Sequence, residues 1–190
     1  MEQSNLPTQR VNISSQKMLG GIGYILGLLP IPLICIFLKI VGYILVLVSM
    51  YQLSNILRKP SIFQKVLIGF ILGIVGVVIA LAFGLMTGVS LFASVRGETG
   101  AILGLGLGVA SAILVAYAAL VVSFYFYKEA YEILAQAIAH NLFKIGGLLL
   151  FIGAITTILF GLGLLLMIVG YIVLAVAFFT APNEVEVQGT

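Results

Sequence analysis

Long apolar runs separated by short polar breaks are the main pattern along the chain. The breaks contain prolines, glycines or charges and leave six runs: about 18–30, 32–50, 62–88, 100–127, 144–160 and 163–180. Runs of about 17–25 apolar residues match the length that a helix needs to cross a hydrocarbon layer of about 30 Å. The apolar positions do not alternate as in a membrane β-barrel. The pattern therefore predicts an all-α membrane protein with about six transmembrane helices, arranged as helical hairpins.

The first and fifth runs are the short ones. They would reach only about 20–24 Å at the helical rise of 1.5 Å per residue. A re-entrant or tilted hairpin that stops short of the far head groups is therefore an alternative to full crossing, provided that neighbouring helices cover its turn. Outside a single helical domain over 17–181, we expect a polar N-terminal tail over 1–16 and a disordered C-terminal tail over 182–190.

The chain contains a repeated phrase. The residues Ile-Val-Gly-Tyr-Ile occur at 40–44 and again at 168–172, and the match extends back to Lys17 and Lys144 if one residue is inserted. The first and third hairpins thus resemble each other, which predicts an internal repeat. Parallel repeats occur in transporters, and they occur equally in proteins that only pack or scaffold.

Small residues recur every four positions in two of the runs. They are Gly76, Ala80, Gly84 and Gly88 in the third run, and Gly100, Gly104, Gly108 and Ala112 in the fourth. Such spacing places a smooth face along one side of a helix and lets a second helix approach closely in lipid. This glycine zipper predicts contact between the third and fourth helices, within one chain or across a dimer.

Composition supports insertion in lipid, and the cations suggest an orientation. The chain is 62% hydrophobic and 8% charged, with a mean hydropathy of +1.28. In a six-span topology Arg96 lies on one side with Lys39 close to it, and the other cations lie opposite: Arg10, Lys17, Arg58, Lys59, Lys65, Lys128 and Lys144. Because cytoplasmic loops carry an excess of Lys and Arg, we expect a multi-pass cell-membrane protein with both termini cytoplasmic. Nucleic-acid binding is not expected, since no basic patch with interleaved aromatics is present.

Side chains that carry chemistry are scarce. The chain has no aspartate, its six acidic residues are glutamates outside the predicted spans, and its one histidine, His140, lies in a linker. A proton relay through the membrane needs a carboxylate or histidine inside it. A Ser/His/Asp triad and a structural zinc site also lack their residues. We therefore expect no enzyme and no cofactor.

Five side chains are candidates for a polar contact or a pathway inside the membrane: Lys39, Tyr43, Tyr171, Thr156 and Thr157. Lys39 is the one charge within an apolar run. Its stem can extend to the head groups, or its ammonium can stand at the mouth of an anion-selective pore. A buried tyrosine hydroxyl needs a partner, which can be a neighbouring group or a ligand.

The linker over 128–140 reads as an amphipathic helix. It is charged at its start and apolar at Tyr131, Ile133, Leu134 and Ile138. Such a helix lies on the membrane surface or prolongs the fourth helix.

Three stretches carry a family resemblance: Ser15–Gly23, Ser61–Phe63 and Leu142–Leu149. With them, the layout from about Ser14 to Pro182 resembles a largely archaeal integral membrane family, domain of unknown function 996. The resemblance implies a polytopic membrane protein and brings no activity or site residues.

Two functions fit these features. The first is a non-catalytic membrane component that acts through helix packing, as a homo-oligomer or as an accessory subunit of another membrane protein. The second is a small channel or carrier with a pathway between the repeated hairpins. No small-molecule ligand is indicated beyond the lipid bilayer itself.

Overall fold

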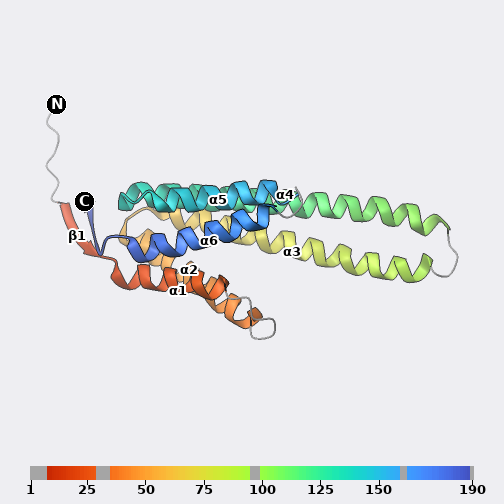
Figure 1. Cartoon of the computed structure of the whole chain (residues 1–190), viewed down its shortest axis with the longest axis horizontal. Helices are drawn as coiled ribbons and strands as arrows, with labels where there is room; N and C mark the ends of the chain where they lie inside the picture. Colours follow the sequence, from red (N-terminus) through yellow and green to blue (C-terminus); the bar gives the residue numbers. More distant parts are fainter. Residues whose placement is uncertain (1–7, 29–34, 95–98, 159–161, 189–190) are drawn as a thin grey trace, which may run out of the picture.

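The computed structural model describes residues 8–28, 35–94, 99–158 and 162–188. Six helices and two short strands follow one another along the chain (Figure 1): β1 Thr8–Asn12, α1 Ser14–Leu28, α2 Cys35–Ile56, α3 Pro60–Ser94, α4 Thr99–Ile138, α5 Leu142–Thr156, α6 Leu162–Thr180 and β2 Glu184–Gln188. The predicted all-α class with six helices in hairpins is confirmed. The six apolar runs correspond one to one with the six helices.

The helices pack in a closed circuit. Each helix packs against the next one along the chain, and α1 packs against α6. We call the end of the bundle that carries β1 and β2 the terminal end, and the opposite end the distal end (Figure 1).

Four helical segments among the described residues are long and apolar enough to cross a membrane: Phe37–Ile56, Pro60–Leu85, Gly108–Ile138 and Leu162–Thr180. The helix Leu142–Thr156 is apolar but shorter, and α1 has the same length of 15 residues. A helix of 15 residues reaches about 22 Å. The two short helices are the ones expected from the first and fifth runs, and each pairs with a longer partner.

The helices α3 and α4 extend past the others. They have 35 and 40 residues, or about 52 and 60 Å at 1.5 Å per residue. The hydroxyl of Tyr117 on α4 donates a 2.6 Å hydrogen bond to the carbonyl of Ile155 near the end of α5. Beyond this point α3 and α4 continue as a two-helix hairpin (Figure 1). We call α3 after Gly76 and α4 before Tyr117 the distal arm.

The small residues expected to join α3 to α4 do so only in part. A Cβ atom on Gly76 would lie 3.1 Å from that of Ala119, so the helices are close there, and Ala112 is buried. Cβ atoms on Gly84 and Gly108 would meet no atom of the described residues within 4 Å. Ala80 is exposed, and three positions lie outside the described side chains: Gly88, Gly100 and Gly104.

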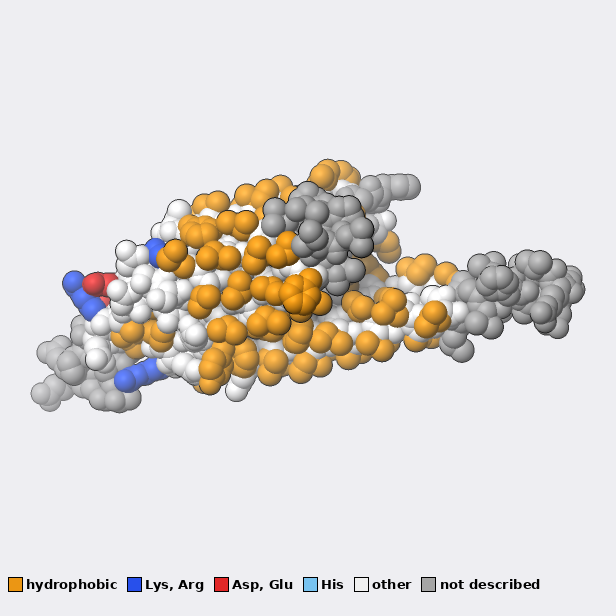
Figure 2. All heavy atoms as spheres, turned by 90° about the horizontal axis from the view of Figure 1, so that it is seen from below, with side chains coloured by type: hydrophobic (Ala, Val, Ile, Leu, Met, Phe, Trp, Pro, Cys, Tyr) orange, Lys and Arg blue, Asp and Glu red, His pale blue; other side chains and the backbone are white. Residues whose placement is uncertain are grey.

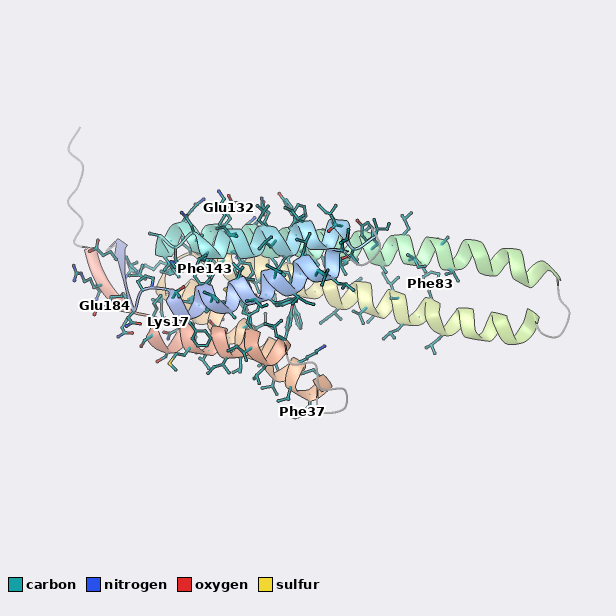
Figure 3. The ribbon with its side chains drawn as sticks, viewed as in Figure 1. Lys17, Phe37, Phe83, Glu132, Phe143 and Glu184 are labelled. Atoms are coloured by element: carbon teal, nitrogen blue, oxygen red, sulfur yellow. The ribbon has the colours of Figure 1, made fainter. Side chains whose placement is uncertain are left out.

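The dense core lies at the terminal end. Its largest fully buried side chains include Tyr131, Phe143 and Phe178, which come from the ends of α4 and α6 and the start of α5. The rings of Phe143 and Phe178 meet edge to face at 4.9 Å between centroids. Phe143 points into the bundle, whereas Phe37 lies at the tip of the first hairpin (Figure 3).

Charged side chains surround this core. Lys65 on α3 pairs with Glu129 on α4. The carboxylate of Glu132 forms ion pairs with the ammonium groups of Lys128 at 3.4 Å and of Lys144 on α5 at 3.2 Å. On the face seen in Figure 2, the visible charges lie at the terminal end, and hydrophobic side chains cover much of the rest of the described surface.

The strands correct the expectation of a disordered C-terminal tail. β2 pairs antiparallel with β1, so that Val185 lies opposite Val11 and Glu186 opposite Arg10. The alternation of Glu and Val in this segment is a strand pattern. It places Val185 in the core, where it is 7% exposed. The expectation was wrong because a partner strand from the other terminus satisfies the backbone of a segment too short to fold alone.

The linker over 128–140 is part of α4, so the second of the two alternatives holds. The helix runs to Ile138 and stops where Ala139 takes a φ of 55°. A left-handed residue just past the last turn is a common helix stop. The linker between α2 and α3 is likewise short and turns at Arg58, with a φ of 54°.

Candidate functional site

A cavity of about 260 Å³ lies at the centre of the helical circuit. We call it the inner cavity. All six helices contribute to its wall: Gly23, Tyr24 and Gly27 from α1, Lys39, Gly42, Tyr43, Val46 and Leu47 from α2, Val66 from α3, Phe124 and Tyr127 from α4, Leu150 from α5 and Tyr171 from α6.

Glycines shape the side of the cavity formed by α1 and α2. A Cβ atom on Gly23 would lie 2.6 Å from the carbonyl oxygen of Gly42, and one on Gly42 would lie 2.6 Å from that of Gly23. The two backbones therefore touch, and neither position accepts a side chain. One turn further along α1, a Cβ atom on Gly27 would meet nothing within 4 Å. The backbone at Gly27 thus faces open space in the cavity wall.

Tyrosine hydroxyls are the main polar groups around the inner cavity. Tyr43 and Tyr127 share a hydrogen bond between their hydroxyls, and Tyr24 shares one with Tyr131. The ring of Tyr171 packs on that of Tyr24 at 5.6 Å between centroids. Within the described part of the chain, the hydroxyl of Tyr171 has no hydrogen bond. It is the tyrosine of this group that retains its full capacity to bind a ligand.

Lys39 stands at the distal mouth of the inner cavity. It lies 17 residues before the end of α2, which corresponds to about 26 Å along the helix axis. Its side chain is exposed. The described residues include no acidic group or hydrogen-bond acceptor in contact with its ammonium. Lys39 and Tyr43 are four residues apart, so they share one face of α2.

Thr156 and Thr157 do not line this cavity. The hydroxyl of Thr156 donates to the carbonyl of Ile152 at 2.9 Å, and that of Thr157 donates to the carbonyl of Gly153 at 2.7 Å. Both hydroxyls are therefore satisfied by the backbone of their own helix, a common arrangement for Thr within helices.

A second hollow of about 480 Å³ adjoins the first. We call it the side groove. It runs along α3 and α4 past Phe70, Ile74 and Leu120, and it shares four wall residues with the inner cavity: Tyr43, Phe124, Tyr127 and Tyr171. The two spaces are therefore neighbours across one aromatic wall.

The inner cavity is closed towards the terminal end. Tyr24 is 5% exposed and Tyr131 is 0% exposed, and their hydrogen bond joins α1 to α4 across the bundle. Phe178 stacks on Tyr24 at 5.8 Å between centroids, and the dense core follows. The cavity is thus closed at its terminal end, and Lys39 belongs to the opposite part of its wall.

The hydrogen bond between Tyr24 and Tyr131 predicts that removing one hydroxyl destabilises the protein more than removing both. Tyr24→Phe should lower the free energy of unfolding by about 1 kcal/mol, because it leaves the buried Tyr131 hydroxyl without a partner. The double variant Tyr24→Phe/Tyr131→Phe should regain part of that loss, since no polar group is then left unpaired. Thermal unfolding in detergent would measure both. If the double variant lost as much stability as Tyr24→Phe and Tyr131→Phe together, the two hydroxyls would not be paired.

Sequence reasoning named Lys39, Tyr43 and Tyr171, which the fold brings together, but it did not name Tyr24, Tyr127 or Gly27. Tyr24 could have been found from the sequence, because any tyrosine inside an apolar run needs a polar partner. Tyr127 stands at the end of the fourth run, where an aromatic residue beside Lys128 is also typical of the membrane interface. No pattern distinguished Gly27 from the glycines that pack.

Comparison with known proteins shows the family of the chain. The family model described as "Protein of unknown function (DUF996)" matches residues 38–172. The chain belongs to the DUF996 family. This DUF996 protein is also 33% identical over 181 residues to the uncharacterized protein MJ1644 of Methanocaldococcus jannaschii, an alignment that covers 93% of this chain and 97% of the relative. No solved structure matches it significantly. The matched range includes Lys39, Tyr43, Tyr127 and Tyr171 but not α1.

Proposed function

We propose that this DUF996 protein is a non-catalytic membrane carrier that binds a small molecule in the inner cavity. The observation that supports this proposal is the inner cavity, to which all six helices contribute and which is closed towards the terminal end. Carriers bind their substrate near the middle of the membrane, at the interface of repeated units, and open to one side at a time. A continuous pore would not need the closure made by Tyr24 and Tyr131.

The two outer hairpins support the same proposal. Gly42 on α2 contacts α1, and a Cβ atom on Gly170 of α6 would lie 2.9 Å from Leu150 of α5. Gly42 and Gly170 are the matching positions of the two Ile-Val-Gly-Tyr-Ile phrases. Tyr43 and Tyr171 follow them and both line the inner cavity. Two equivalent hairpins around one site are the arrangement that alternating access uses.

A cavity-filling variant tests the carrier function. Gly27→Leu should abolish uptake of transported solutes into proteoliposomes, because its side chain enters the inner cavity without meeting backbone. Gly84→Leu makes the same change at an equally open glycine on the distal arm and should leave uptake as in the parent protein. A panel of organic anions, cations and neutral solutes supplies the substrates. Equal uptake by both variants, or uptake of no solute by the parent protein, would count against a carrier.

The distribution of cations supports an orientation, which we propose as terminal end in the cytoplasm and the bundle in the cell membrane. Arg10, Lys17, Lys59 and Lys144 all belong to the terminal end, and cytoplasmic segments carry such an excess. A cysteine at Gln9 in a Cys35→Ala background should react with a membrane-impermeant maleimide only after the cells are opened. Labelling of intact cells would reverse the orientation.

The distal arm favours a second candidate function, association with another membrane protein or with a second copy. Most of its described side chains are apolar, and many are exposed, for example Leu81 at 63% and Leu114 at 69%. Gly84 and Gly108 have no described atom near their missing side chains, which leaves room for another helix. Native mass spectrometry after gentle solubilisation distinguishes the outcomes. A discrete assembly lost in Gly84→Leu supports association, and a monomer without partners opposes it.

A further inference from the structure

We propose that the inner cavity and the side groove together bind one amphipathic anion, with its head group at Lys39 and its apolar chain in the side groove. This inference rests on the proposed carrier function and names its class of ligand. The shared chemistry is a single carboxylate or phosphate on a hydrocarbon chain, as in a free fatty acid or an anionic lipid.

The head-group end has one cation and one unused donor. Lys39 lines the inner cavity without an acidic partner among the described residues. One turn along α2, Tyr43 faces the same space. The hydroxyl of Tyr171 is unpaired in the described structure and can donate a hydrogen bond. A cation and a hydroxyl donor near a non-aqueous space select an anionic acceptor, since such hydrogen bonds are stronger than neutral ones.

The chain end is apolar beyond its border with the inner cavity, where the hydroxyl of Tyr171 lies. The side groove is lined by apolar side chains such as Phe70, Ile74 and Val77, and Ser123 is an exception. Its hydroxyl donates a 2.6 Å hydrogen bond to the carbonyl of Gly69, so it is already satisfied. The hydroxyls of Tyr43 and Tyr127 satisfy each other. A polar ligand group in this groove would lose its hydration without replacement, which is unfavourable.

The two hollows adjoin. Tyr43, Phe124, Tyr127 and Tyr171 line both the inner cavity and the side groove. A ligand with its head group at Lys39 would, in this proposal, extend its chain past this aromatic wall towards α3 and α4. A small inorganic anion would gain only the contacts around Lys39, and a neutral lipid would gain only the groove. An amphipathic anion gains both.

Binding of paired ligands to paired variants tests the head-group contact. Dodecanoate and dodecanol have the same chain and differ in charge, and both can be titrated into the full-length protein in neutral-lipid nanodiscs with native mass spectrometry as the readout. Dodecanoate should bind about tenfold more tightly than dodecanol, the effect of one charge-assisted hydrogen bond. Lys39→Gln should remove this difference, and Lys39→Arg should retain it. Because Lys39 is exposed, neither variant is expected to unfold the protein.

Photocrosslinking tests the chain contact. A dodecanoate analogue with a diazirine at the end of its chain should label peptides from α3 and α4 around Phe70 and Leu120. Gly27→Leu should reduce the labelling, and Met18→Leu, at an exposed position on the same helix, should not. Labelling spread evenly over lipid-facing helices, or equal affinity for dodecanoate and dodecanol, would overturn the proposal.

The binding and uptake measurements also distinguish a membrane lipid from a free amphiphile as the ligand. They test the carrier function and the ligand class separately. An anionic phospholipid that copurifies and is displaced by dodecanoate would assign the site to a membrane lipid, whereas an empty site that fills with dodecanoate would assign it to a free amphiphile. Solute uptake that is blocked by Gly27→Leu without any preference for dodecanoate would leave the carrier in place and reject this ligand class. Selective binding of dodecanoate without transport would reject the carrier and retain the site.

Discussion

Replacing Phe143 with alanine should lower the free energy of unfolding by about 3–5 kcal/mol, the largest effect that we expect from a single substitution. The ring is 0% exposed and meets Phe178 edge to face. It also stacks on Tyr131 at 6.5 Å between centroids. Its removal would leave a cavity where α4, α5 and α6 meet. Dense packing on three sides prevents the neighbours from collapsing into that space.

Phe37→Ala provides the control for this loss. Phe37 is 74% exposed, so its truncation creates no internal cavity and should change stability by no more than about 0.5 kcal/mol. Denaturant titration of both variants in the same detergent would compare them. Equal losses for Phe143→Ala and Phe37→Ala would show that the terminal core is not where the stability of the bundle resides.

The second large effect is expected at Gly163. A Cβ atom there would collide with the carbonyl oxygen of Gly153 and the backbone of Thr157. The obstacle is backbone, which cannot rotate away as a side chain can, so Gly163→Ala should destabilise the hairpin of α5 and α6 by about 3 kcal/mol. The measurement is again unfolding in detergent, with helical content followed by circular dichroism.

Gly84→Ala is the matched substitution. It changes the same residue type within a helix, but its Cβ atom would meet nothing within 4 Å. Alanine is favoured over glycine in helix interiors by about 1 kcal/mol, so this variant should be neutral or slightly stabilised. The two glycine substitutions are thus expected to differ in sign. A stable Gly163→Ala variant would mean that α5 and α6 do not cross as closely as described.

The helices could be predicted from the sequence because the apolar runs and the polar breaks between them are local features. The sixth run was placed at 163–180, and α6 spans Leu162–Thr180. The fourth run was placed at 100–127, whereas α4 continues to Ile138, and the charges after Tyr127 left the surface helix and the prolonged helix as alternatives. In the structure Glu129 and Glu132 are paired with Lys65 and with Lys144. Those partners come from other helices, so they leave no signal in the local pattern.

The candidate site was predictable to a similar extent. Polar groups within apolar runs identified Lys39, Tyr43 and Tyr171. The same reasoning selected Thr156 and Thr157, whose hydroxyls bond to carbonyls of their own helix. A threonine has this local option and a tyrosine does not, because its hydroxyl lies too far from its own backbone. The reach of the side chain, rather than its polarity, distinguished the residues that gather at the cavity.

The pairing of β1 with β2 has a consequence for the order of assembly. These strands and the contact of α1 with α6 close the helical circuit. A ribosome delivers α1 before α6 and β2, so the face of α1 around Gly20, which packs on Phe178, has no native partner until α6 has been made. During that interval the nascent chain is a row of hairpins with one unpaired face. The helical circuit therefore closes only when α6 is in place.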